Sequence, residues 1–249
     1  MDMSVYQYII EKRAAGQKML ALLLDPDAYG PDRFDLLAEV LQQCPPGLIF
    51  VGGSLVTADT SAFIRKVKAI TTVPVILFPG NVSQFSESAD ALLFISLLSG
   101  RNPEFLIGQH VVAAPMIRRC GMEAISTGYL LIDGNSVTSV QYMSNTMPIP
   151  ANKTDIALAT ALAAELLGMK LVYLEAGSGA DSPVPAGLIE AVRRELTVPL
   201  IVGGGLNSAV KIERACLAGA DILVIGNALE KDIAMLVEYN RIVSSFSLQ

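Results

Sequence analysis

The stretch Leu171-Val172-Tyr173-Leu174-Glu175-Ala176-Gly177-Ser178-Gly179 is an apolar run that ends in an acidic residue and then in Gly-Ser-Gly. The apolar part predicts a buried strand, and a carboxylate at the mouth of such a strand can accept or release a proton. Small residues beyond the strand allow backbone N–H groups to approach a phosphate closely. This order of residues predicts an enzyme site for a phosphorylated small molecule.

Two later stretches repeat the order of an apolar run followed by small residues. They are Leu200-Ile201-Val202-Gly203-Gly204-Gly205 and Ile222-Leu223-Val224-Ile225-Gly226-Asn227. Each precedes a predicted helix, whose amino-terminal N–H groups and dipole favour a phosphate. Since the seventh and eighth strand ends form the usual phosphate site of (β/α)8 barrels, we predict that these two loops bind a phosphate group.

Eight short apolar runs without polar alternation predict a parallel sheet that is covered on both faces. They span residues 19–24, 48–51, 75–78, 91–97, 124–131, 171–174, 200–202 and 222–225. Helical stretches between them predict right-handed βαβ connections, and eight repeats fit a closed (β/α)8 barrel. An open doubly wound sheet is the alternative, but the first run is not followed by the Gly-x-Gly-x-x-Gly of a dinucleotide fold.

The predicted helices span residues 32–42, 60–70, 105–116, 154–167, 186–196, 208–217 and 230–243. Because no linker, low-complexity tract or charge block divides the chain, residues 1–249 are predicted to form one domain. The segment from Asp133 to Pro150 is longer than a normal crossover needs. Its length and its Asn and Pro residues predict a loop with a function of its own.

Composition limits the classes of partner. The formal net charge is −6, which argues against nucleic acid or an anionic membrane as the main partner. Cys44, Cys120 and Cys216 are widely spaced and odd in number, which indicates a reducing compartment rather than a disulfide or zinc set. The amino terminus mixes charged and apolar residues, unlike a signal peptide, and no apolar run is long enough to cross a bilayer. We expect a soluble, cytoplasmic protein.

Oxygen donors follow the first two predicted strands. Asp25-Pro26-Asp27 ends the first strand, and Gly52-Gly53-Ser54 ends the second. Asp25 and Ser54 together are plausible ligands of a hard cation such as Mg²⁺, although turn and capping roles explain these residues as well. Asp27 is predicted to be structural.

Tyr173 and Glu175 leave the same face of one strand, toward the barrel interior or its mouth. Together they are suited to hold a substrate hydroxyl and remove its proton, and Glu175 is the predicted base. A Glu paired with a barrel Lys and a Tyr that fills the core are the structural alternatives. The only histidine, His110, lies in a helical stretch and is predicted to be structural, which disfavours zinc hydrolase and Ser-His-Asp chemistry.

A series of motifs in this order resembles the geranylgeranylglyceryl phosphate synthase family, which includes the heptaprenylglyceryl phosphate synthases. The motifs are LLLDPD, FVGGSLVT, VILFPGN, ALLFISLLSGRNP, ISTGYLLIDG, YLEAGSGA, IVGGG and VIGNALE. The resemblance covers the chain from about Leu20 to Glu230, and YLEAGSG and LDPD are its most specific parts. It implies a modified (β/α)8 barrel and a Mg²⁺-dependent prenyltransferase that makes an ether lipid precursor.

The resemblance also implies roles for individual residues. It places Mg²⁺ on Asp25 and Ser54, and it makes Glu175 the base, with Tyr173 beside it. The residues implied to bind sn-glycerol-1-phosphate are Tyr173, Leu174, Glu175, Ala176, Gly177, Ser178, Gly179, Gly203, Gly204, Gly226 and Asn227. The other substrate is a polyprenyl diphosphate, with geranylgeranyl diphosphate expected and the longer heptaprenyl donor as the alternative. A homo-oligomer, either a dimer or a hexamer, is expected.

Two other functions remain open from the residues alone. Sugar-phosphate isomerases share the barrel and its phosphate loops, and Asp133 after the fifth strand would have to be their second acid or base. A non-catalytic binder of a phosphorylated ligand is the third possibility, against which the acidic residues argue. Metal-dependent turnover distinguishes the binder from both enzymes.

Overall fold

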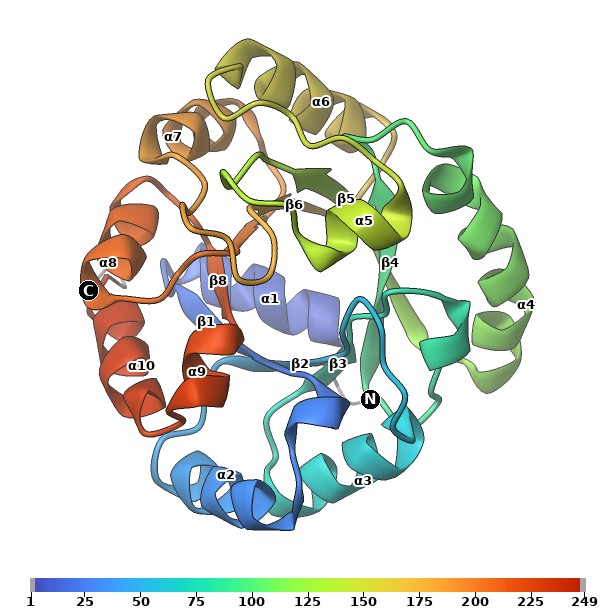
Figure 1. Ribbon diagram of the computed structural model, residues 1–249, viewed down its shortest axis with the longest axis vertical. Helices are drawn as coiled ribbons and strands as arrows, with labels where there is room; N and C mark the ends of the chain where they lie inside the picture. Colours follow the sequence, from blue (N-terminus) through green and yellow to red (C-terminus); the bar gives the residue numbers. More distant parts are fainter. Residues whose placement is uncertain (1–2, 247–249) are drawn as a thin grey trace.

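The eight apolar runs form parallel strands that pair in sequence order and close into a barrel (Figure 1). The computed structural model describes residues 3–246. The strands are β1 (Met19–Leu24), β2 (Leu48–Val51), β3 (Val75–Leu77), β4 (Ala91–Leu97), β5 (Glu123–Leu131), β6 (Leu171–Glu175), β7 (Leu200–Gly203) and β8 (Ile222–Ile225). Pairing of Met19 in β1 with Ile222 in β8 completes the ring. The predicted barrel is therefore confirmed, and the open sheet is wrong.

Helices surround the barrel everywhere except after β3. They are α2 (Pro31–Gln43), α3 (Thr60–Ile70), α4 (Gln109–Cys120), α6 (Thr154–Leu166), α7 (Ala186–Glu195), α8 (Ala209–Leu217), α9 (Asn227–Lys231) and α10 (Met235–Ser245). Between β3 and β4 the described chain forms only a short 3-10 turn, η2 (Val82–Gln84). The outer surface of β3 and β4 is thus less thickly covered than that of the other strands.

Two predicted helices differ from the observed ones. The helix expected at 105–116 opens with a π-helical turn, η3 (Glu104–Gly108), and runs on to Cys120, where Gly121 ends it with a φ of 71°. The single helix expected at 230–243 is divided into α9 and α10. Asp232 leaves helical geometry, and its side chain accepts a hydrogen bond from the Ala234 N–H at 3.0 Å in the turn before the second helix.

Alternation along the strands assigns each side chain to one of two apolar layers. In β6, Leu171 and Tyr173 point into the barrel, while Val172 and Leu174 pack outward against the helices. In β1, Met19 and Ala21 point inward, and continuing this alternation aims Asp25 at the barrel mouth. Glu175 is brought to the same mouth in the same way, which confirms the shared face of Tyr173 and Glu175.

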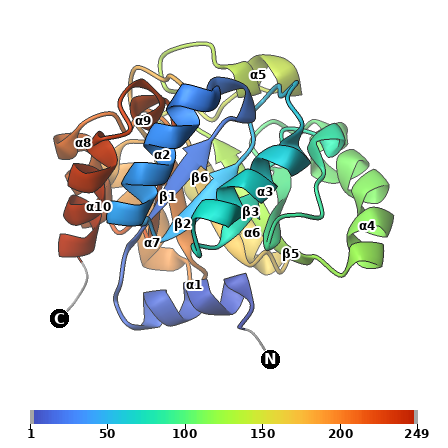
Figure 2. The ribbon, with the colours of Figure 1, turned by 90° about the horizontal axis from the view of Figure 1, so that it is seen from below.

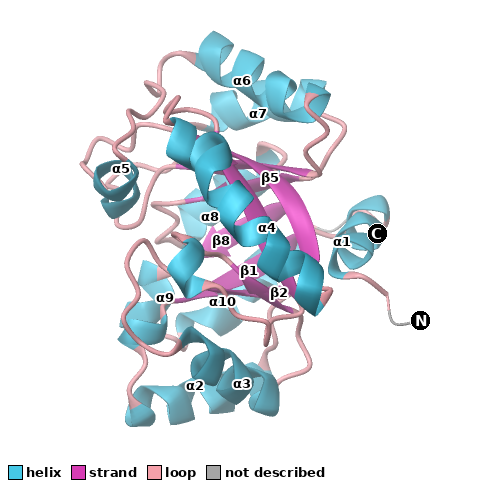
Figure 3. Cartoon of the chain, turned by 90° about the vertical axis from the view of Figure 1, so that its right-hand side faces the viewer, coloured by secondary structure: helices cyan, strands magenta, loops and turns pink. Residues whose placement is uncertain are grey.

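A helix that the sequence did not predict closes the amino-terminal end of the barrel. Helix α1 (Val5–Ala14) lies across this end, opposite α5 and α9 (Figures 2 and 3). Its first N–H groups, on Val5 and Tyr6, donate to the Glu123 carboxylate at 2.6 and 3.0 Å. Ile9 is fully buried in the inner layer. The barrel is therefore open to ligands only at its carboxyl-terminal end.

The long segment after β5 crosses this open end. It carries the short helix α5 (Ser139–Ser144) and returns to β5, where the Asp133 N–H donates to the Ile149 carbonyl at 2.9 Å. Thr138, at the start of α5, packs directly against Gly177 of the β6 loop. The predicted extra loop thus covers part of the mouth (Figure 1).

Candidate active site

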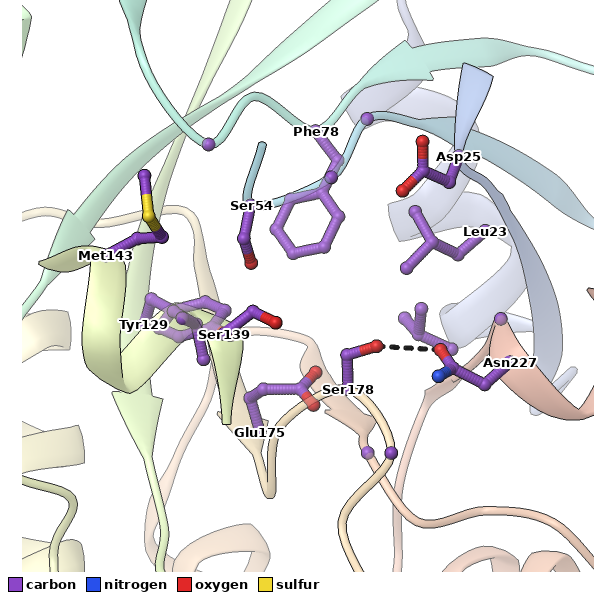
Figure 4. A pocket seen from close by; sticks show the side chains of 18 of the residues that line it. Leu23, Asp25, Ser54, Phe78, Tyr129, Ser139, Met143, Glu175, Ser178 and Asn227 are labelled. Carbon is purple, nitrogen blue, oxygen red and sulfur yellow. Dashed lines mark hydrogen bonds between the residues drawn. The ribbon is translucent and has the colours of Figure 1, made fainter. Parts of the chain in front are cut away.

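A cavity of about 300 Å³ lies at the carboxyl ends of the strands. Residues of β1, β4, β5, β6 and β8 and of the loops that follow the strands line it (Figure 4). Glu175, Ser139, Ser54 and Ser178 offer oxygen atoms to this space, while Phe78 and Tyr129 form an apolar wall. The cavity occupies the position at which (β/α)8 enzymes carry out their chemistry.

The Glu175 carboxylate is the most deeply placed acidic group of the cavity. Only 6% of this residue is exposed, and its Oε1 accepts a hydrogen bond from the Gly177 N–H at 2.7 Å. Burial raises the pKa of Glu175 to about 7, although the nearby Tyr173 hydroxyl and the Gly177 N–H oppose the rise. A carboxylate with this pKa is a much stronger base than an exposed one.

Gly203 makes room for Tyr173 and Glu175, the predicted catalytic pair. A β-carbon added there would lie 2.5 Å from the Tyr173 hydroxyl oxygen and 2.6 Å from Glu175 Oε2. Both polar atoms therefore occupy the hollow above the Gly203 backbone. The buried Tyr173 hydroxyl has no hydrogen-bond partner among the described residues, and it lies beneath the cavity beside the Glu175 carboxylate.

The loops after β6 and β8 meet at one polar contact. The Ser178 hydroxyl donates to Asn227 Oδ1 at 2.7 Å, and both residues are exposed in the cavity (Figure 4). Gly204 and Gly205 follow β7 with positive φ angles of 79° and 67°, which turn the backbone beside them. Hydroxyl, amide and backbone N–H groups from three loops are thus brought together.

The predicted acceptor residues divide into two groups. Glu175, Ser178, Gly179, Gly204, Gly226 and Asn227 line the cavity. Tyr173, Leu174, Ala176, Gly177 and Gly203 do not line it. Leu174 and Ala176 pack in the outer layer, and Tyr173 and Gly203 lie beneath Glu175. Direct substrate contact stays a prediction for both groups.

Asp25 and Ser54 face the cavity from neighbouring strand ends, as predicted. Asp25 Oδ1 accepts the Asp27 N–H at 3.0 Å, and a β-carbon at Gly53 would lie 2.7 Å from Oδ2. Gly53 therefore leaves the second carboxylate oxygen free beside the loop that carries Ser54. Carboxylate and hydroxyl oxygens in a half-buried position fit a hard cation such as Mg²⁺.

The charge of the cavity also favours a cation. Asp25, Glu175 and Glu230 line it, whereas none of the lining residues, all within the described chain, is Lys, Arg or His. Burial and the negative charge of Asp25 raise the pKa of Glu230. The lining residues therefore offer a phosphate N–H groups and hydroxyls as partners, and no cationic side chain.

The apolar wall formed by Phe78 and Tyr129 was not predicted from the sequence. Tyr129, on β5, is 5% exposed and its ring centroid lies 5.0 Å from that of Tyr173. Phe78 stacks on Tyr173 with centroids 5.6 Å apart. Tyr129 lies in the ISTGYLLIDG motif at an inward-pointing strand position, so strand alternation is the signal that could have identified it.

A second, smaller cavity of about 80 Å³ adjoins the first at the gap left by the missing helix. The two share Pro79, Gly80, Ile95 and Phe105. Its other walls come from η2 and α4 and are mainly apolar; they include Val82, Phe85, Phe94 and Ala113. We call this second cavity, which adjoins the main one between β3, β4 and α4, the apolar extension.

Residues predicted to be structural behave as such. Asp27 accepts the N–H groups of Thr57 and Ala58 at 2.9 and 2.7 Å and joins the first two strand loops. His110 is buried against Phe94, and its Nε2 lies 3.1 Å from the Ser96 hydroxyl. The three cysteines are free.

Asp133 accepts a hydrogen bond from the Asn135 N–H of its own loop at 2.9 Å and does not line the cavity. This position disfavours the isomerase alternative, which needs Asp133 as a second acid or base.

Comparison with known proteins identifies the family. The model of the PcrB family matches residues 9–244. The chain belongs to the PcrB family. Geranylgeranylglyceryl phosphate synthase from Chitinophaga pinensis is 48% identical over 239 residues, which cover 96% of this chain and 95% of that one. The enzyme of the same name from Spirosoma linguale is 47% identical over 94% of this chain and 95% of its own length.

A solved structure extends the likeness to three dimensions. Geranylgeranylglyceryl phosphate synthase from Thermoplasma acidophilum, crystallised with its substrate sn-glycerol-1-phosphate, matches with a TM-score of 0.89 and 33% identity over 99% of both chains. The resemblance predicted from the motifs is therefore confirmed. This PcrB-family chain is an enzyme of the geranylgeranylglyceryl phosphate synthase type, built on the same barrel.

Proposed function

We propose that this protein joins the prenyl group of a polyprenyl diphosphate to the 3-hydroxyl of sn-glycerol-1-phosphate and so makes an ether lipid precursor. The observation that carries the proposal is the buried Glu175 carboxylate, held in the hollow above Gly203 between three phosphate-type loops. The Thermoplasma enzyme, which binds this acceptor by its name and structure, supports the choice of substrate.

The acceptor phosphate binds the loops after β6, β7 and β8, where Ser178, Gly204 and Asn227 line the cavity. Its 3-hydroxyl then points down toward Glu175 and the unpartnered Tyr173 hydroxyl. Glu175 takes the hydroxyl proton while the oxygen forms a bond to C1 of the prenyl group. The bond from C1 to the diphosphate breaks, and its electron pair leaves with the diphosphate.

Asp25 and Ser54 would hold Mg²⁺ on the opposite side of the cavity. When bound, the ion supplies positive charge that stabilises the departing diphosphate. The cavity itself offers three carboxylates and, among its lining residues, no cationic side chain. The metal is therefore the natural counter-charge for a diphosphate in this cavity.

The apolar extension is the place for the prenyl tail. A donor whose diphosphate lies near Asp25 can pass Phe78 and Phe105 and enter the second cavity between η2 and α4. Burial of the tail against these side chains contributes apolar binding free energy. We propose geranylgeranyl diphosphate as the donor, and heptaprenyl diphosphate as the longer alternative.

The test is product formation from labelled sn-glycerol-1-phosphate with Mg²⁺ and a series of donors from geranyl to heptaprenyl diphosphate. An ether product whose yield peaks at one donor length establishes the reaction and identifies the donor. A parallel reaction with sn-glycerol-3-phosphate controls for acceptor geometry and should yield far less product. Absence of product at every donor length, with sn-glycerol-1-phosphate still bound, would contradict the proposal.

A further inference from the structure

In the segment over the barrel mouth, three apolar side chains face solvent while three hydroxyl-bearing side chains are buried. Val137, Tyr142 and Met147 are 78%, 81% and 79% exposed. Thr138, Ser144 and Thr146 are 5%, 2% and 6% exposed, and the last two hydroxyls lie 2.6 Å apart in hydrogen-bond contact. This is the reverse of the usual arrangement at a protein–water surface.

Exposed apolar residues of a second loop continue this surface. Leu55, after β2, is 61% exposed, and Met143, on α5, is 46% exposed; both also line the main cavity. We call Leu55, Val137, Tyr142, Met143 and Met147 the apolar rim. The rim therefore adjoins the opening through which substrates reach Glu175.

The two loops that form the rim are uncharged. No Asp, Glu, Lys or Arg occurs between Gly52 and Ala58 or between Gly134 and Asn152. Moving the rim into an apolar medium thus requires the desolvation of no charged group of these loops. Exposed Tyr and Met side chains without charge are typical of contacts with the boundary zone of a lipid layer.

We propose that the apolar rim docks reversibly on an uncharged lipid surface and so transfers the long apolar chain between the bilayer and the cavity. The inference rests on the proposed function, because the occupant is chosen by the prenyl chain that must enter and leave beside Leu55 and Met143. A mouth that faced water would expose this chain during each turnover. Docking without insertion also agrees with the helices, since none within residues 3–246 has the length and hydropathy to cross a membrane.

The chain contains no Trp, so a single introduced Trp reports docking without background. In Val137→Trp, phosphatidylcholine vesicles should shift the emission to the blue, and brominated lipid should quench it. The matched control is Leu217→Trp. Leu217 is 72% exposed where α8 ends, before β8 begins, and hence lies at the opposite end of the barrel. Its emission should not change.

A second variant separates docking from catalysis. Val137→Ser combined with Met147→Ser should lower partitioning onto phosphatidylcholine vesicles by about tenfold. It should slow turnover of a vesicle-borne long donor and leave turnover of soluble geranyl diphosphate in vesicle-free buffer unchanged. Glu175→Gln should bind vesicles like the unaltered protein although its turnover is lost, which distinguishes failure of docking from failure of the proposed reaction.

Three results would overturn the proposal. The first is unchanged emission of Val137→Trp with phosphatidylcholine vesicles. The second is binding that needs phosphatidylglycerol and disappears in high salt, because an apolar contact is insensitive to both. The third is a blue shift of the Val137→Trp emission that occurs without lipid, increases with protein concentration and coincides with a doubled mass in sedimentation. This result would mean that a second copy of the chain covers the rim.

Discussion

The two sides of the cavity are built by different means. On the β6–β8 side, polar groups come from three short loops, and the proposed base Glu175 is buried against the Gly177 N–H and glycines. On the β1–β4 side, one carboxylate and one hydroxyl lie near the apolar extension, where only η2 connects β3 to β4. The first side is suited to a small polar acceptor, and the second to a charged head with an apolar tail.

This difference shows how far each side of the cavity depends on local sequence. The polar side is encoded in three compact stretches, so a single substitution there changes the geometry of the base. The apolar side depends on packing between η2, β4 and α4, so single substitutions there change which donor fits rather than whether the reaction occurs. The following predictions test this division.

The largest effect is expected for Glu175→Gln. The amide can still accept the Gly177 N–H but cannot take a proton from the acceptor, so kcat should fall by about 10²- to 10⁴-fold. Initial rates with saturating substrates measure the effect. Glu190→Gln, at an exposed position of α7, is the matched control and should keep full activity. A Glu175→Gln rate near that of the unaltered enzyme would remove the proposed base.

Gly203→Ala should affect catalysis without removing any functional group. The new methyl group would lie 2.6 Å from Glu175 Oε2 and must displace the carboxylate, which should lower kcat by about 10- to 100-fold. Gly187→Ala is the control, since its β-carbon meets nothing within 4 Å. Equal rates for both variants would show that the hollow above Gly203 does not position the base.

Asp25→Asn tests the other side of the cavity. Loss of one carboxylate oxygen should weaken Mg²⁺ binding by about tenfold or more, equivalent to about 1.4 kcal/mol, in a titration of rate against Mg²⁺ and in direct calorimetry. The control is Asp27→Asn. This change breaks the contacts to Thr57 and Ala58 and should lower the melting temperature without changing the titration. An unaltered metal titration for Asp25→Asn would count against the ligand assignment.

Ala113→Leu should have the smallest effect and the most selective one. The larger side chain fills the second cavity, so KM for the best long donor should rise by about fivefold while KM for geranyl diphosphate stays constant. Ala114→Leu, at the neighbouring exposed position of α4, should change neither value. A uniform rise for all donors would place the tail elsewhere.

Strand alternation made much of the fold and one side of the site predictable. Eight buried runs identified the barrel, and counting by two from Tyr173 placed Glu175 at its mouth. Helix α1 escaped prediction because only Val5 and Ile9 of its residues are buried, too few for a clear apolar stripe. The role of Gly203 also escaped, since a sequence does not reveal which side chains meet across two strands.

The apolar extension, the proposed place for the prenyl tail, was the least predictable part. Its walls come from η2, β4 and α4, which are distant in sequence, and any barrel contains similar apolar residues. Packing, rather than composition, decides whether they leave a cavity. The exposure of Val137 and the burial of Thr138 were not predictable either, because they also depend on packing.

The pH dependence of kcat/KM tests the central claim most directly, namely that a buried carboxylate with a raised pKa is the base. Because only the ionised form of Glu175 accepts a proton, kcat/KM should rise with pH along a limb with an apparent pKa of about 7 and then reach a plateau. The residual activity of Glu175→Gln should lack this limb. Titration of the substrate phosphates would instead leave the limb in place in this variant, so the comparison distinguishes the two causes. A limb of the same pKa in Glu175→Gln would contradict the account.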